Sequence, residues 1–283
     1  MRSRPSTRSR RRFVIRWAER AAGALLVLLV AAGAVSARDR GADGEFSKRE
    51  SSHFVLFQDV DIDRSGGFHG SRRFEQRVLD GLEAAYRQLD HYLGLRPTRK
   101  LEVVIYDPAI FDRQFAGLFR FAAAGFYSGS IRVRGGDRYS EPLSRVLAHE
   151  LVHAALDAVT PSAVYPAWFN EGLAEWFEAR IHGKRHLTAG ELAHLRNAHA
   201  TAQLVAFEAL AMPSFSRMSP EAARVAYAQS YALMEFLGRR YGERSLREFC
   251  VELVRTGNLD RTLRRVFRSD LQGLEAAFIA DLG

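Results

Sequence analysis

Two histidines and a glutamate stand close together near the middle of the sequence. His149 and His153 are four residues apart, and Glu150 follows the first of them in residues 148–154 (AHELVHA). On a helix this spacing puts both imidazoles on one face, about 40° apart around the axis, so that both reach one metal ion. Imidazoles in this HExxH pattern typically bind Zn²⁺, and Glu150 stands where a base beside the ion is needed.

The chemistry of such a site is hydrolysis by activated water. Zinc polarises a carbonyl group and lowers the pKa of a bound water molecule toward about 7. Glu150 is then the candidate catalytic base, which takes a proton from water and hands it to the leaving amine. The three residues could instead lie on a solvated helix face. However, Leu147, Leu151 and Ala155 make the helix largely apolar, and a buried His-Glu-His group needs a partner such as a metal ion.

A catalytic zinc site needs a third protein ligand and one open position. Eighteen residues after His153 comes Glu171, within residues 168–176 (WFNEGLAEW). Together, HELVH and WFNEGLAEW resemble the gluzincin metallopeptidases, with a close match to the W-x-N-E-G-x-A stretch of the aminopeptidase N-like group. The second half of the chain also resembles the peptidase MA-like domains. The resemblance implies that Glu171 is the third zinc ligand and that the domain has the zincin-like metallopeptidase fold.

Two further acids follow Glu171 on the same helix face. Glu175 and Glu178 stand four and seven residues after it, and Gly172 leaves room for another helix to approach closely. An acid in this place can accept the second N–H of a histidine ligand. Glu175 is the first choice for this role and Glu178 the second, while a solvated position would explain either acid equally well.

Members of the resembled family often place a hydroxyl or imidazole group opposite the zinc, where it stabilises the oxyanion. Tyr227 and Tyr231 stand 56 and 60 residues after Glu171, a gap that resembles that of the aminopeptidase-like group. They are four residues apart and share a helix face. One of them is expected to face the zinc, with Tyr227 preferred. The alternative is a pair of rings packed in the core.

Gluzincins bind extended substrates along an edge strand near the active-site helix, and residues 125–133 are the candidate. The G-x-M-E-N stretch with which the aminopeptidase group holds a substrate's amino terminus does not occur in this sequence. The resemblance therefore implies a zinc metallopeptidase, a hydrolase of peptide or protein substrates. The absence of the G-x-M-E-N stretch favours an endopeptidase or an unusual substrate.

Two other hypotheses stay open. The first is a catalytically silent zinc-binding envelope protein that binds a peptide or protein partner. A base beside the metal argues against it, because binding alone needs none. The second is a membrane-anchored structural protein in which the motif is incidental.

The rest of the sequence must position these residues. Apolar, β-rich runs predict strands at residues 53–60 and 101–106, and residues 125–134 predict a third strand or a hairpin. Helical spacing of apolar residues predicts helices at residues 72–93, 140–159, 167–181, 188–210, 220–240, 243–256 and 259–281. The fold class is therefore α+β, with a small sheet and a helix in the first half and mostly helices in the second.

The 283-residue chain has a net charge of +8, and most of this charge comes from the N-terminal residues 1–37, called the leader below. Residues 1–37 hold eight Arg and one Glu, and the rest of the chain has a net charge of about +1, so nucleic-acid binding is not expected. Residues 21–35 form an uncharged apolar run, short for a membrane span, and residues 35–37 (VSA) fit a signal-peptidase site. A cleaved export signal and an uncleaved membrane anchor both fit, and both place the body outside the cytoplasm, periplasmic or extracellular.

These patterns divide the chain into three expected parts. Cys250 is the only cysteine, which excludes an internal disulfide and a cysteine-rich zinc site. The expected parts are an export signal or signal anchor at 1–37, a linker at 38–50, and a gluzincin-like metallopeptidase domain at 51–283, divided into a β-containing part at 51–139 and a helical part with the zinc site at 140–283.

Overall fold

The structure is a computed structural model, and it describes part of the chain. The described residues are 46–60, 69–118, 123–136, 138–161 and 163–283. All of them belong to one structural unit, Arg40–Gly283. The expected export signal, with its apolar run at 21–35, lies outside the described residues. None of the helices in the described part has the length and apolar character needed to span a bilayer.

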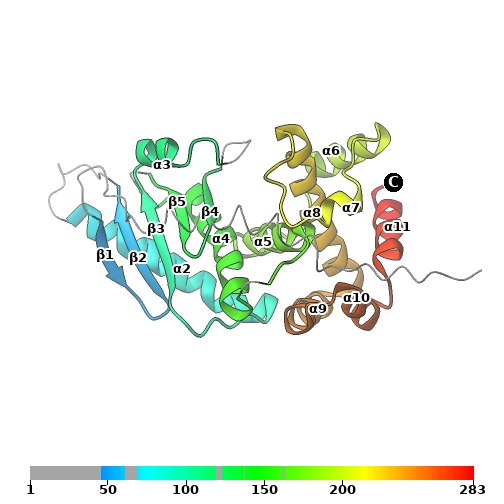
Figure 1. Cartoon of the computed structure of the whole chain (residues 1–283), viewed down its shortest axis with the longest axis horizontal. Helices are drawn as coiled ribbons and strands as arrows, with labels where there is room; N and C mark the ends of the chain where they lie inside the picture. The colour runs from blue at the N-terminus through cyan, green and yellow to red at the C-terminus, as the bar shows by residue number, and fades with distance from the viewer. Residues whose placement is uncertain (1–45, 61–68, 119–122, 137, 162) are drawn as a thin grey trace, which may run out of the picture. The chain divides into compact units, whose positions relative to one another are not determined.

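A five-stranded mixed sheet is built from the first half of the described chain (Figure 1). Its order is β1-β2-β3-β5-β4, with both outer strands antiparallel to their neighbours and the inner strands parallel. The edge next to β5 is therefore formed by the short strand β4. The strands are β1 (Ser47–Glu50), β2 (Phe54–Asp59), β3 (Leu101–Tyr106), β4 (Gly125–Tyr127) and β5 (Ile131–Arg134).

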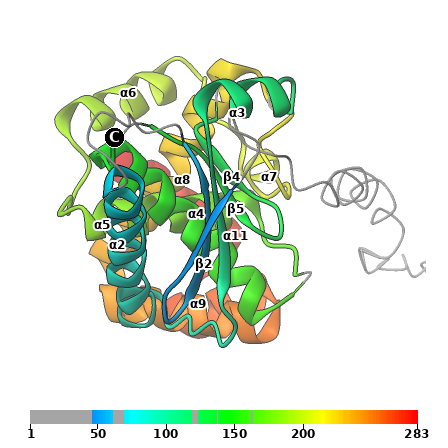
Figure 2. The ribbon, with the colours of Figure 1, turned by 90° about the vertical axis from the view of Figure 1, so that its left-hand side faces the viewer.

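The second half of the chain is almost wholly helical. Figure 1 places α4 and α5 between the sheet and the later helices, and Figure 2 shows α2 running along the sheet. The helices are α2 (His69–Leu93), α3 (Pro108–Gln114), α4 (Glu141–Val159), α5 (Ala167–Ile181), α6 (Ala189–Ala200), α7 (Phe207–Leu210), α8 (Pro220–Tyr241), α9 (Glu243–Thr256), α10 (Leu259–Phe267) and α11 (Leu271–Leu282).

The sheet separates two apolar layers. Leu56 and Val103 belong to the main core, which continues through α2 and α4 into the helical half. Phe57 and Val104, their neighbours along the strands, face the other way and pack with Phe111 of α3. This alternation follows from the two-residue period of a β-strand, and it confirms the strands predicted at 53–60 and 101–106.

Helices α5 and α8 approach each other closely at Gly172. A Cβ atom at this position would lie 2.6 Å from the backbone oxygen of Ser230, so only glycine allows this approach. The predicted role of Gly172 is thereby confirmed. The neighbouring side chains Trp168 and Trp176 are fully buried and anchor α5 in the core.

Two predicted helices are each interrupted. The range 188–210 divides into α6 and α7, and Ala202 between them has a positive φ of 53°. The range 259–281 divides at Arg268, which ends α10 with a φ of 55°, before Asp270 caps α11. Neither interruption contains Gly or Pro, the residues that usually mark one.

Strand β1 corrects another expectation. Residues 47–50 were expected in the linker, but they pair with β2, from Ser47 opposite Gln58 to Glu50 opposite Val55. The strand is short, polar and mostly exposed, so it has no apolar alternation that the sequence could show. Residues 125–134 form the hairpin of β4 and β5, one of the two predicted alternatives.

Candidate metal centre

Helix α4 begins at a strong start signal. The Ser140 side chain accepts a hydrogen bond from the backbone N–H of Leu143, with Glu141 and a proline in the first turn. The helix then buries Leu147 and Leu151 among its apolar residues. Burial of this face fixes the rotation of the helix, which directs the His149 side chain toward α5.

The side chains of His149, His153 and Glu171 converge. Oε2 of Glu171 lies 3.4 Å from Nε2 of His149 and 3.5 Å from Nε2 of His153. One donor atom from each of the three lies within 4.8 Å of the others, a separation at which they could hold one metal ion. The structure therefore brings together the three residues predicted as zinc ligands.

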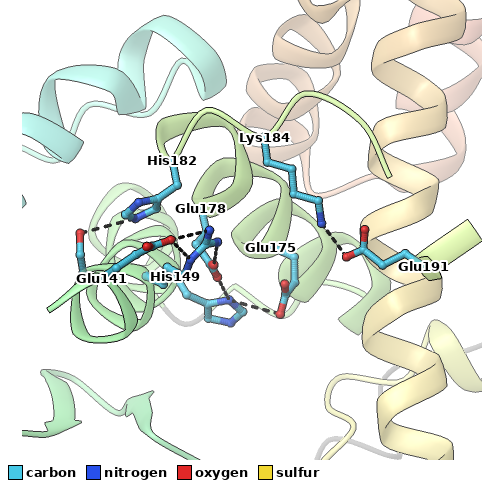
Figure 3. A network of polar contacts seen from close by, with 9 residues as sticks. Glu141, His149, Glu175, Glu178, His182, Lys184 and Glu191 are labelled. Carbon is cyan, nitrogen blue, oxygen red and sulfur yellow. Dashed lines mark hydrogen bonds and ion pairs between the residues drawn. The ribbon is translucent and has the colours of Figure 1, made fainter. Parts of the chain in front are cut away.

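The other ring nitrogen of His153 is hydrogen-bonded, and that of His149 lies near two carboxylates. Nδ1 of His153 lies 3.0 Å from Oδ1 of Asn170. Nδ1 of His149 lies 3.7 Å from Glu175 and 3.9 Å from Glu178, and Figure 3 shows both carboxylates directed toward it. The acceptor at Nδ1 of His153 keeps the proton there and leaves Nε2 as the nitrogen available to a metal.

Asn170 is a residue to which the sequence interpretation gave no role. It belongs to the WFNEG stretch and directly precedes Glu171, but the sequence does not show that its side chain contacts His153. Glu175 and Glu178, the first and second candidates for a contact with a histidine ligand, lie 3.7 and 3.9 Å from Nδ1 of His149.

The charges of the site fit a bound cation. Burial alone would raise the pKa of Glu171, but the two imidazoles hold it well below its usual range. Burial alone would lower the pKa of His149, but the neighbouring carboxylates, Glu171 first among them, raise it to about 10. The pKa of His153 is raised in the same way. Without metal, protons on the imidazoles balance the carboxylates, and a divalent ion among the same atoms would replace them.

A second set of donor atoms also lies close enough for a metal ion: His149, Glu175 and Glu178. In this set Glu178 already has a cation as its partner, since Arg145 donates to it at 2.9 Å. The set with two imidazoles and Glu171 is the one with the ligand types of a catalytic zinc site, so the chemistry of the donors favours it.

The Glu150 side chain is buried beside the three converging side chains, and only 6% of the residue is exposed. Burial raises the pKa of Glu150 above its usual range, and the positive charges of His149 and His153 only partly oppose this. A carboxylate with a raised pKa is a better proton acceptor near neutral pH than an exposed one.

Tyr227 and Tyr231 have different surroundings. Burial and the negative charges of Glu171 and Glu150 raise the pKa of Tyr227, so its hydroxyl stays protonated next to the site. Tyr231 lies one turn further along α8, with Nζ of Lys184 4.5 Å from its ring centre. The structure thus brings Tyr227 to the candidate ligands and directs Tyr231 toward the α5–α6 connection.

The edge strand β4 lies against α4, the helix that carries His149 and His153. A Cβ atom at Gly125 would come within 2.6 Å of a methyl group of Val146, so the glycine allows close contact with α4. The Tyr127 hydroxyl donates to Asp157 of α4 at 2.6 Å and fixes the other end of the strand. Burial and this hydrogen bond raise the pKa of Tyr127 to about 12.

A separate cavity of about 500 Å³ lies on another face of α4. Ser144, Leu147 and Ala148 line it together with residues of α2 and of the end of α5, and none of the candidate ligands does. The converging donor atoms, and not this cavity, identify the candidate site.

The mixed sheet followed by a helical half is the α+β fold class that the sequence predicted. The family model described as the Peptidase MA superfamily matches residues 83–282. The chain therefore belongs to the Peptidase MA superfamily, as its resemblance to the gluzincins implied. A comparison with curated proteins found no match.

The solved structures that match this chain include a zinc metallopeptidase and a hydrolase. An M1 zinc metallopeptidase from Deinococcus radiodurans, bound to a Tyr-Ser-Ala substrate, is 11% identical with a TM-score of 0.43, and the match covers 84% of this chain and 52% of that chain. Yeast LTA4 hydrolase in complex with Bestatin is 14% identical with a TM-score of 0.47, and the match covers 84% of this chain and 38% of that chain. This chain thus spans about half, or less, of these longer proteins.

Proposed function

We propose that this protein is a zinc-dependent peptidase that hydrolyses peptide bonds within extended chains. The observation that carries the proposal is the convergence of two imidazole nitrogens and one carboxylate oxygen, with the buried Glu150 beside them. Membership of the Peptidase MA superfamily supports it.

His149, His153 and Glu171 would hold the zinc ion. When bound, zinc would supply a Lewis acid that polarises the scissile carbonyl group and makes water more acidic. Glu150 accepts the proton of the attacking water at its carboxylate and returns it to the leaving amine. The Tyr227 hydroxyl, which stays protonated, donates a hydrogen bond to the developing oxyanion.

The substrate is an extended peptide that pairs with β4. This strand is an edge of the sheet, so its outer backbone groups can bind another strand. Its contacts with Val146 and Asp157 hold it against α4, the helix that carries His149 and His153. Main-chain pairing on both sides of the cleaved bond, without the amino-terminal recognition stretch of the aminopeptidases, is typical of an endopeptidase.

The proposal includes a place of action outside the cytoplasm. It is supported by the arginine-rich leader and the apolar run at residues 21–35. Fractionation of cells that produce the full chain tests this, because the protein should appear in the periplasm, in the medium or on the outer side of the membrane.

The variant Glu150→Gln tests the mechanism. The amide has nearly the shape of the carboxylate but cannot accept the proton, so peptide cleavage should fall by about 10² to 10⁴-fold while bound zinc stays the same. Cleavage is measured on a library of quenched peptides and zinc by metal analysis of the purified full chain. The exposed Glu248→Gln variant is the matched control and should cleave like the wild type.

Two results would contradict the peptidase. Undiminished cleavage by Glu150→Gln would exclude Glu150 as the base. A wild-type protein that binds zinc but cleaves no peptide in the library would instead favour the catalytically silent zinc-binding protein.

A further inference from the structure

Arg145 lies one turn before His149 on α4, and its guanidinium group pairs with Glu141 and Glu178. We propose that Arg145 is a positioning residue of the zinc site, which holds the carboxylate of Glu178 beside His149 and thereby strengthens zinc binding. The inference rests on the proposed zinc site and adds a residue to which the sequence pattern assigned no role.

Glu178 connects Arg145 to the histidine. Its Oε1 accepts a hydrogen bond from Nη1 of Arg145 at 2.9 Å, and its Oε2 lies 3.9 Å from Nδ1 of His149. The two oxygens of one carboxylate thus have different partners, and Figure 3 shows this carboxylate beside the His149 ring. Turning Glu178 away from His149 would break its ion pair with Arg145.

The guanidinium is itself held in place. Nε and Nη2 of Arg145 lie 3.1 and 3.0 Å from Oε1 of Glu141, one turn earlier on α4. The arginine therefore spans two carboxylates, one on its own helix and Glu178 on α5. A planar group with donors on several edges can do this, whereas the single ammonium group of a lysine is less suited to it.

Several negative charges lie close together around Glu178, and the positive charge of Arg145 reduces their repulsion. Glu171, Glu175 and Glu178 lie on one face of α5, and the Glu178 side chain is only 15% exposed. Their mutual repulsion favours rotation of Glu178 toward solvent. Arg145 offsets this repulsion and keeps the Glu178 carboxylate beside Nδ1 of His149.

An acceptor at Nδ1 affects the opposite nitrogen of the ring. It fixes the ring orientation and tautomer and makes Nε2 a stronger ligand. Loss of such a partner typically weakens metal binding by about 10 to 100-fold. Arg145 should therefore influence zinc affinity through Glu178, without contact with the ion.

Zinc affinity of the full-length protein, measured by competition with a chromogenic chelator at fixed pH, tests the inference. Arg145→Met should raise the zinc Kd by about 10-fold or more, and Arg145→Lys should restore part of the loss. The matched control is Arg224→Met, which removes an exposed arginine paired with Glu221 and should leave the Kd unchanged. Melting curves of the metal-free variants show that each is folded.

A double-mutant cycle separates positioning from a general structural effect. Arg145→Met should have little further effect in a Glu178→Gln background, since Arg145 acts through that carboxylate. Equal losses of affinity in both backgrounds, or a Kd for Arg145→Met within about 3-fold of the wild type, would overturn the inference. Absence of zinc binding by the wild type would instead contradict the proposed zinc site.

Discussion

At the scale of single residues, Tyr227 and Tyr231 lie one turn apart on α8 but have different electrostatic surroundings. Both hydroxyls are on α8, but only Tyr227 has Glu171 and Glu150 as the main charges that act on it. The Tyr231 hydroxyl is buried and has no hydrogen-bond partner among the described residues. Its pKa is raised to about 12, by burial first and by Glu191 next.

The variants Tyr227→Phe and Tyr231→Phe should therefore behave differently. Tyr227→Phe removes a donor to the oxyanion and should lower kcat by about 10 to 10³-fold, with zinc affinity little changed. Tyr231→Phe removes a buried hydroxyl without a partner, so kcat should stay and stability should be unchanged or rise by up to about 1 kcal/mol. Peptide cleavage and urea unfolding measure the two effects, and the reverse pattern would assign the catalytic hydroxyl to Tyr231.

The sequence predicted which residues form the site, but not the side-chain contacts that hold these residues in place. His149, His153 and Glu171 follow from fixed spacings along single helices and from a family motif, so their convergence could be expected. The acceptor role of Asn170 and the ion pair from Arg145 to α5 depend on how two helices are rotated against each other. Side-chain pairs between helices leave no periodic signal in a single sequence.

At the scale of elements, the distance between α5 and α8 decides whether Tyr227 reaches Glu171. Gly172 directly follows Glu171, and the α8 backbone at Ser230 lies against it. The glycine therefore sets the geometry of the site as well as the packing of the core.

The variant Gly172→Ala should separate the two helices slightly. A methyl group 2.6 Å from the oxygen of Ser230 forces a shift that should cost about 1 to 3 kcal/mol of unfolding free energy and lower kcat, because Tyr227 moves with α8. Gly190→Ala is the control, since its Cβ would meet open space in α6 and alanine favours a helix. Urea unfolding checks both, and a Gly172→Ala protein as stable as the wild type would refute the close-packing argument.

Helices were predicted correctly where apolar residues recur at helical spacing over a long segment. The face of α2 that carries Val78, Leu82 and Leu89 is buried, as its spacing predicted. The interruptions at Ala202 and Arg268 could not be predicted in this way, because ordinary residues adopt a left-handed conformation there. Tertiary packing imposes such conformations against local preference.

At the scale of the whole described domain, the candidate site joins two helices that pack on different parts of it. Helix α4 packs against β4 and β5, while α5 packs against α8 (Figure 1). A zinc ion bound by His149 and His153 on α4 and by Glu171 on α5 would link a helix that packs on the sheet to a helix that packs on α8. The metal should thus stabilise the entire domain and not only its own surroundings.

Removal of zinc should therefore lower the melting temperature of the protein. At a free zinc concentration of about 100 times the Kd, binding adds about 2.7 kcal/mol of stability, which corresponds to roughly 5 to 10 °C for a domain of this size. Calorimetry with and without a chelator measures the shift. Glu150→Gln should keep it, because the base is not a ligand, whereas His153→Ala should lose most of it. A melting temperature that does not depend on zinc in the wild type would show that the two helices are held together without a metal, and the three converging side chains would then be an ion-pair cluster of the core.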